Sequence, residues 1–230
     1  KRQPRYEQFT FAREFHVKRE SKGQSSLGWQ NSGPAPDSGI EAWEHRVGLW
    51  DGKKVKLYVN GELAASKDGL AGPMDNIPGG TLAFGVGWDL DLLPEGNYFQ
   101  GQMDDIRIYN RALSEEEVEE LYNLEKPKPT GEPSGTAGLS KGLVAYYPFN
   151  GNVRDESGNG NDGEAKGATL GVDRHGKSNS AYNFDGKDDY IKISDHTDLQ
   201  VGSNGSVTLW ALMKAKEKGR KGARFFAKNK

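Results

Sequence analysis

One short run of alternating residues constrains the fold of this chain more than any other feature. In KVKLYVNGEL, residues 54–63, the apolar residues Val55, Leu57 and Val59 alternate with lysine and tyrosine. A strand with this period of two buries one face and leaves the other in water. The asparagine–glycine pair that follows favours the positive φ angles of a two-residue hairpin turn. The run therefore predicts an antiparallel hairpin with one face in a core.

Other short runs rich in β-branched and aromatic residues follow along the chain, separated by turns of glycine, asparagine and aspartate. The predicted strands are residues 43–50, 103–109, 143–149, 182–184, 190–193 and 207–213. Many short strands with such turns between them are typical of an antiparallel sandwich. We expect an all-β protein in which two sheets pack face to face.

One helix interrupts this pattern. Ser114 and Glu117 have the spacing of a capping box, in which each side chain binds the backbone N–H of the other residue. Val118, Leu121 and Tyr122 then recur at helical spacing and form an apolar stripe. A short helix that docks on the sandwich is the expected result.

Composition excludes several classes of protein. The formal net charge of -2 argues against a dedicated nucleic-acid surface, which is usually basic. No apolar run approaches the roughly 20 residues of a membrane-spanning helix. The chain has no cysteine, so disulfides and cysteine-ligated zinc are excluded.

A proline-rich segment divides the chain. Residues 126–140 begin KPKPTGEPSG and show no apolar periodicity, and their prolines favour an extended spacer. We therefore expect three parts: residues 1–125, a linker over residues 126–140, and residues 141–230.

Long motifs on both sides of the linker resemble the bacterial laminin-G-like family of the concanavalin A-like lectin/glucanase superfamily. Before the linker they are WEH at 43–45, DGKKVKLYVNG at 51–61 and FQGQMDDIRIYNRALS at 99–114. After it they are GLVAYYPFNG at 142–151, DESGNGNDG at 155–163 and YNFDGKDDYI at 182–191. The resemblance implies an antiparallel β-sandwich of the jelly-roll, concanavalin A-like type with one short helix.

The order of these motifs is reversed relative to the family, where the YYPF motif comes first and RIYNRALS comes last. Residues 1–125 resemble the C-terminal half of a laminin-G-like sandwich, and residues 141–230 resemble the N-terminal half. If residues 225–230 are placed before residues 1–10, they resemble two neighbouring strands and their turn. The linker then joins the usual ends of the domain, which often lie close together. The second half could complete the first half of its own chain or of a neighbouring chain, and the latter gives a head-to-tail filament.

The sequence predicts no catalytic activity. Glucanases of this superfamily carry a Glu-x-Asp-x-x-Glu strand, and their chemistry needs two carboxylates about 5 to 10 Å apart. No such strand occurs here, and Asp188 and Asp189 would face opposite ways on a strand. Nucleophile, metalloprotease and phosphate-loop motifs are missing as well. A glucanase-like glycoside hydrolase is the remote alternative.

The best chemical hypothesis is a calcium site. The run DESGNG at 155–160 alternates oxygen-bearing residues and places glycine sixth, as an EF-hand loop does, but Lys166 at position twelve excludes a true EF-hand. On a regular strand Asp104 would point the same way as Ile106, toward the core, where a carboxylate needs a metal, an arginine or a backbone donor. The alternative is that the loop is only a turn. The resemblance implies a structural calcium, with predicted ligands Asp104, Asp155, Ser157, Asn159, Asn161 and Asp162.

Aromatic residues near loops are candidates for ligand binding. Trp29, Trp88 and Tyr98 could stack on sugar rings, although such residues also plug the ends of sandwiches. Asp89 and Asp91 beside Trp88 add the polar groups that a ligand site needs.

The resulting hypothesis is a non-catalytic module of a secreted or cell-surface protein that contains tandem repeats. It would bind a glycan or a surface protein, or it would build head-to-tail filaments with neighbouring copies by complementation of half-domains. The alternative is a monomeric, lectin-like carbohydrate-binding module. Neither hypothesis involves nucleic acid or a membrane span.

Overall fold

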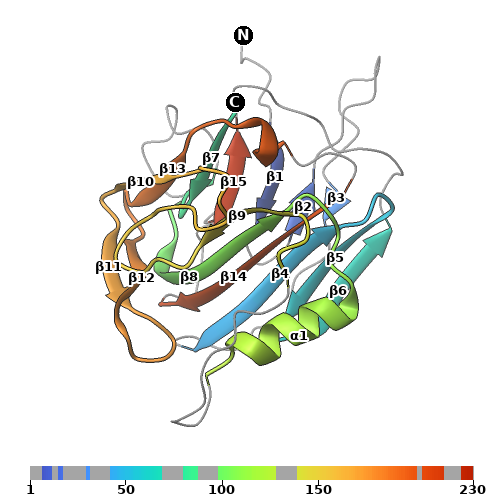
Figure 1. Ribbon diagram of the computed structural model, residues 1–230, viewed down its shortest axis with the longest axis horizontal. Coiled ribbons are helices and arrows are strands. Elements are labelled where there is room, and N and C mark those ends of the chain that lie inside the picture. The colour runs from blue at the N-terminus through green and yellow to red at the C-terminus, as the bar shows by residue number, and fades with distance from the viewer. Residues whose placement is uncertain are drawn as a thin grey trace.

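Two antiparallel sheets packed face to face, with helix α1 (Glu115–Glu125) on the outside of one of them, form the protein (Figure 1). The computed structural model describes residues 7–11, 15–17, 30–31, 42–68, 80–87, 98–127, 139–200, 204–214 and 224–229. The predicted all-β sandwich with one helix is confirmed.

The seven-stranded sheet runs in the order β10 (Gly163–Lys166), β13 (Tyr190–Ile193), β7 (Thr81–Phe84), β15 (Phe226–Asn229), β1 (Glu7–Phe11), β2 (Phe15–Val17) and β3 (Gln30–Asn31). The eight-stranded sheet runs in the order β11 (Thr169–Val172), β12 (Ser178–Asp185), β8 (Gln100–Tyr109), β14 (Gly205–Met213), β4 (Trp43–Trp50), β5 (Lys54–Val59) and β6 (Glu62–Asp68). Its eighth strand, β9 (Leu143–Tyr147), pairs with β8 outside this order. A short 3-10 helix, η1 (Thr197–Leu199), follows β13.

Strands from before and after the linker interleave in both sheets. Among the residues that the structure describes, thirteen strand pairings occur, and seven of them join the two halves: β1–β15, β7–β13, β7–β15, β4–β14, β8–β14, β8–β12 and β8–β9. Within the described strands, β7 and β8 find all their partners in the other half. Neither half can therefore satisfy its own strand edges, because unpaired backbone groups in a core are costly.

The two ends of the described chain lie side by side. Glu7 in β1 stands opposite Asn229 in β15, and the two strands run antiparallel. The prediction that the first and last segments form neighbouring strands is thereby confirmed. At the other junction, Leu143 after the linker stands opposite Tyr109, close to the start of α1. Residues 128–138 of the predicted linker lie outside the described residues.

The core forms between the sheets as the alternating pattern predicts. Val55, Leu57, Ile106 and Ile108 are fully buried, while Val59 is partly buried and packs against the same cluster. Burying a side chain of this size stabilises a fold by about 1.5–3 kcal/mol. The hydrophobic effect therefore fixes which face of each strand points inward.

Helix α1 covers the outer face of the eight-stranded sheet (Figure 1). The Ser114 hydroxyl accepts the N–H of Glu117 at 3.2 Å, and the Glu117 carboxylate accepts the N–H of Ser114 at 2.8 Å, so the predicted capping box is present. Val118 belongs to one buried apolar cluster with Val47 and Leu49 of β4. The outer face of this sheet is thus a second, smaller core beneath the helix.

Close approach between β8 and β14 requires glycine at one position. Gly101 has a φ of 154°, and a Cβ atom added there would lie 2.1 Å from the carbonyl oxygen of Leu212. That oxygen belongs to the backbone of β14 and cannot move without breaking the ladder between the two halves. The position therefore depends on the absence of a side chain.

We expect Gly101→Ala to lower the free energy of unfolding by at least about 2 kcal/mol, because the methyl group forces β8 and β14 apart. Gly151→Ala is the matched control: Gly151 also has a positive φ, of 80°, but no atom lies within 4 Å of its added Cβ. It should cost only about 1 kcal/mol of backbone strain. Urea denaturation measures both, and equal losses would show that the close approach does not matter.

Candidate functional site

Asp104, one of the predicted calcium ligands, lies on the outer face of the eight-stranded sheet. Asp105 has a φ of 46°, and the register with β14 shifts so that two residues of β8 stand opposite Leu209 alone. This β-bulge reverses the alternation of side chains along the strand. The expectation that Asp104 points the same way as Ile106 is wrong for this reason. Its carboxylate forms an ion pair with Arg174 instead.

Asp104 belongs to a buried charge cluster beneath α1, made of Asp104, Asp105, Arg107, Glu125 and Arg174. Arg174 pairs with both aspartates, with Nη2 at 2.6 Å from the Asp105 carboxylate, and its Nε donates to the Glu125 carbonyl oxygen at 2.7 Å. Arg107 pairs with Glu125 and lies 3.7 Å from Asp105. Arg174 follows the linker and the other four precede it, so the cluster joins the two halves.

Aromatic side chains complete the surroundings of the cluster. The indole N–H of Trp210 donates to Glu125 Oε2 at 2.8 Å, and the Tyr146 hydroxyl donates to Asp105 Oδ1 at 2.7 Å. The Arg107 guanidinium lies 4.0 Å from the Tyr146 ring centroid. Trp210 and His45 also contact each other, with ring centroids 5.3 Å apart. The charges are therefore enclosed by rings rather than exposed to a ligand.

The charge cluster contains three carboxylates and two guanidinium groups, so the acidic groups outnumber the basic ones by one. This excess of negative charge favours protonation of a carboxylate. Burial raises the pKa of Glu125 to about 7 despite the attraction of Arg107. Burial and the neighbouring Asp105 likewise raise the pKa of Asp104 well above its usual value. Burial opposes ionisation of Asp105 as well, but Arg107 and Arg174 prevail and hold the pKa of Asp105 low. The folded cluster thus keeps a carboxyl proton at a pH at which an exposed carboxyl group has lost it. Burial lowers the pKa of the neighbouring His45 to about 3, so this imidazole stays neutral.

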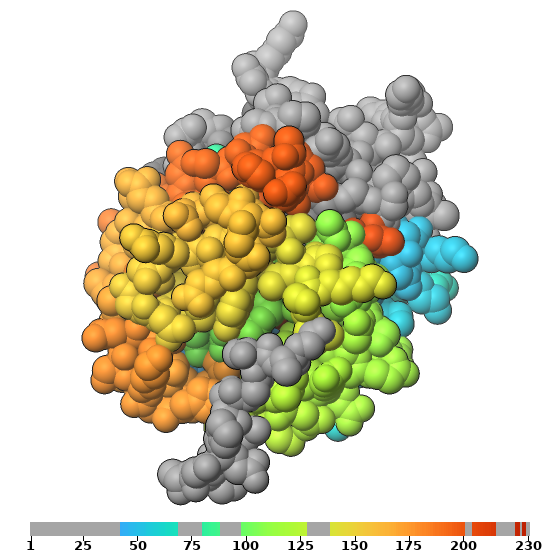
Figure 2. Space-filling model, in the orientation of Figure 1, coloured from blue at the N-terminus to red at the C-terminus, as the bar shows by residue number. Residues whose placement is uncertain are grey.

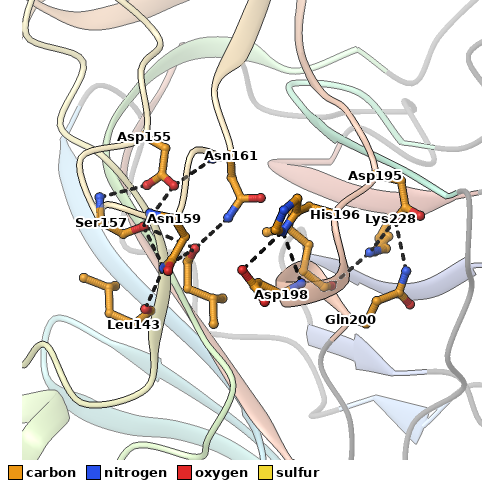
Figure 3. Close-up of polar contacts among 12 residues, drawn as sticks. Leu143, Asp155, Ser157, Asn159, Asn161, Asp195, His196, Asp198, Gln200 and Lys228 are labelled. Atoms are coloured by element: carbon orange, nitrogen blue, oxygen red, sulfur yellow. Dashed lines mark hydrogen bonds and ion pairs between the residues drawn. The ribbon is translucent and has the colours of Figure 1, made fainter.

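The other predicted calcium ligands do come together, in the loop between β9 and β10 (Figure 3). Asp155 Oδ1 accepts the N–H groups of Tyr146 and Ser157, both at 2.9 Å. Its Oδ2 accepts the Ser157 hydroxyl and the Asn161 N–H, also at 2.9 Å. This loop lies on the face that Figure 2 shows, where the yellow segment after the linker borders the green helix.

Most of the other polar side chains of the loop are also hydrogen-bonded within the protein. Asp162 Oδ1 accepts the N–H of Asp155 at 2.9 Å, and the amide groups of Asn159 and Asn161 donate to the Val144 carbonyl oxygen. Asn161 Oδ1 is buried and accepts no hydrogen bond. As folded, the loop satisfies its carboxylates with backbone donors and does not arrange them around a cation. To bind calcium, the loop would have to exchange these hydrogen bonds for contacts with the ion. The calcium site stays a prediction.

Tyr98, a predicted ligand-binding residue, lies beside the turn between β12 and β13. It is partly buried, and burial together with Tyr190 and Asp188 raises its pKa. Asp185, Asp188 and Asp189 each offer a carboxylate oxygen, and these oxygens lie within 4.8 Å of one another. We call Tyr98, Tyr190 and these three aspartates the Tyr98 rim. Trp29, Trp88, Asp89 and Asp91 lie outside the described residues.

The sequence reasoning missed this acidic group. It treated Asp188 and Asp189 as neighbours on a strand, which would face opposite ways. In the structure both precede β13 and lie in the turn after β12, where Asp189 Oδ2 accepts the N–H of Asp185 at 2.8 Å. The DGKDD run, with its glycine and three aspartates, was the available turn signal.

The first half of the chain is similar to a known protein family. Residues 8–119 match a laminin-G family model described as the concanavalin A-like lectin/glucanases superfamily. The first part of the chain is therefore similar to laminin-G-like domains of the concanavalin A-like superfamily, and the two-sheet sandwich is consistent with that fold. Domains of this family are generally non-catalytic and typically extracellular.

A uroporphyrinogen decarboxylase from Campylobacter hominis is 31% identical over 94 residues, which is 38% of this chain and 27% of that protein. The chain thus spans about a quarter of that relative, and its name carries no argument about activity here. No solved structure matches the chain. Among the described residues, no helix has the length and apolarity needed to cross a membrane.

The charge cluster makes stability depend on pH. Between about pH 4.5 and 7 the unfolded chain has already released the proton that the folded cluster still holds. A raised carboxyl pKa therefore stabilises the fold below this window, and that contribution is lost as the pH rises through it. We expect Asp104→Asn, which removes the excess charge, to reduce this loss by about 1–3 kcal/mol.

Urea denaturation on either side of the window measures the effect. Glu119→Gln, at an exposed position on α1, is the control and should keep the wild-type dependence on pH. If Asp104→Asn loses as much stability across the window as the wild type, the cluster does not carry the extra proton.

Proposed function

We propose that this chain is an extracellular, non-catalytic module that binds glycans through the Tyr98 rim. The observation that carries the proposal is the gathering of Tyr98 and Tyr190 with three carboxylates at one turn. Aromatic rings provide apolar faces for sugar rings, and nearby carboxylates accept hydrogen bonds from hydroxyl groups. A protein ligand at the same surface is the competing outcome.

The placement of the carboxylates supports a non-catalytic role. Glycoside hydrolysis needs two carboxyl groups that flank the scissile bond from opposite sides. Asp104, Asp105 and Glu125 are enclosed in the charge cluster, and Asp155 organises its own loop. The carboxylates of the Tyr98 rim all come from a single turn. This arrangement suits binding better than the glucanase-like alternative.

A second role, head-to-tail assembly, is favoured by the interleaving of the halves. β14 lies between β8 and β4, and β15 lies between β7 and β1, so each inserted strand would find the same partners in a neighbouring chain. A linker of 15 residues, from 126 to 140, spans roughly 45 Å when extended at about 3.1 Å per residue. Exchange of halves between copies would then build a filament.

We expect screening on a glycan array to identify a ligand whose affinity falls at least tenfold in Tyr98→Ala. Loss of the ring removes the stacking surface, whereas Tyr98→Phe retains it and should bind nearly as well as the wild type. Leu63→Ala, at an exposed position on the edge strand β6, controls for unspecific effects. A chain that binds only protein ligands, or binds glycans equally without Tyr98, contradicts the glycan proposal.

The same titration in calcium and in chelator tests the calcium proposal. An ion that binds only the folded state raises the melting temperature by mass action. Equal affinity and equal melting temperature in both buffers would argue against a calcium site.

Assembly has its own measurement. If halves exchange between chains, light scattering at increasing concentration should show species larger than 25.3 kDa, and shortening the linker should increase them, since a short linker prevents closure within one chain. A chain that stays at 25.3 kDa after concentration and after refolding contradicts the filament role.

A further inference from the structure

A fully buried lysine lies in the middle of the seven-stranded sheet. Lys228 is on β15, between β7 and β1, and it stands opposite the core residue Leu82. The residue is 0% exposed, although lysine is almost never fully buried without a partner. The position is unusual because an apolar side chain would fill the same space at lower cost.

The buried amine of Lys228 has two oxygen atoms within hydrogen-bonding distance (Figure 3). Lys228 Nζ lies 3.3 Å from Asp195 Oδ1 and donates to the Leu199 carbonyl oxygen at 2.9 Å. The Gln200 amide donates to the same Asp195 oxygen at 3.0 Å. η1, which follows Asp195, therefore holds both the amine and the carboxyl group in place.

Burial makes the neutral form of Lys228 easier to reach than that of an exposed lysine. Burial lowers the pKa of Lys228, and the attraction of Asp195 only partly opposes this. A neutral, desolvated lysine amine is a nucleophile, as in enzymes that use lysine covalently. The Asp195 carboxyl group, whose Oδ1 lies 3.3 Å from Nζ, offers an electrophilic carbon beside the amine. Well-oriented contact within a folded protein corresponds to an effective concentration of about 10⁵ M or more.

We propose that Lys228 and Asp195 condense to form an intramolecular isopeptide bond. Within the ion pair one proton passes from Lys228 Nζ to the Asp195 carboxylate, and Nζ then attacks Cγ, so that a C–N bond forms and one C–O bond breaks. The leaving oxygen carries its own proton and takes one from the amine, and departs as water. No oxidant, cofactor or second substrate is required.

The neighbouring groups have defined parts in this step. The Gln200 amide donates to the carboxyl oxygen on which negative charge develops during the attack. The Leu199 carbonyl oxygen accepts an N–H of the amine and orients it. Asp195 is 27% exposed at its side chain, so the released water has a route to solvent.

The bond would fasten the last strand to the body of the sheet. Asp195 follows β13 and Lys228 lies on β15, so the link closes a loop that contains β14. A covalent link of this kind reduces the entropy of the unfolded chain, as a disulfide does. In a chain without cysteine it would supply that constraint in another form.

Intact-mass spectrometry of the purified, denatured chain tests the proposal. We expect the mass to fall below that of the sequence by one water molecule, and proteolysis to yield a branched peptide that joins residues 195 and 228. Asp195→Asn should lose one ammonia instead, because the leaving group is then nitrogen. Lys228→Arg should keep its full sequence mass.

The mass of the wild-type chain alone decides whether the bond forms. The test therefore does not depend on how well the variants fold. A wild-type chain at full sequence mass after incubation in its folded state shows that Lys228 and Asp195 form only an ion pair and overturns the proposal. Glycan binding and light scattering are separate readouts, so this result leaves the proposed function untouched.

Discussion

The insertion of β14 between β8 and β4 is the contact on which the rest of the structure depends. Both neighbours come from before the linker and β14 comes from after it, so its backbone ladders join the halves through the centre of the eight-stranded sheet. The inner face of β14 places Val207, Leu209 and Ala211 in the main core. Its outer face places Trp210 beneath α1. One strand thus connects both sheets, the helix and both halves.

The charge cluster gives this junction its specificity. Buried ion pairs contribute little net stability, because the desolvation of the ions offsets their attraction. The loss of one partner is costly, however, and Arg174 must arrive from the far side of the linker to match Asp104 and Asp105. An arrangement in which the halves are misplaced would leave these charges buried and unpaired. The cluster therefore penalises alternatives more than it stabilises the native state.

The two internal polar clusters and the Tyr98 rim lie in different parts of the sandwich. The charge cluster and the Asp155 loop use their oxygens within the protein, whereas the Tyr98 rim leaves carboxylates and a tyrosine near the surface. A rigid sandwich with polar groups at its turns can present a ligand surface without moving. This division suits a module that recognises a partner and does not transform it.

The local sequence determined the elements but not all of their contacts. Period-two alternation located β5 and the inward faces of Val55 and Leu57, and the Ser114–Glu117 spacing located the start of α1, because both signals depend only on neighbours along the chain. The motifs also predicted the pairing of the first strand with the last, which the structure shows. The reversed order of the halves relative to the family stays a prediction. The bulge at Asp105 and the role of Arg174 were decided by the tertiary structure. Each depends on a residue about 70 positions away or on a backbone angle that breaks alternation, and no local periodicity records either.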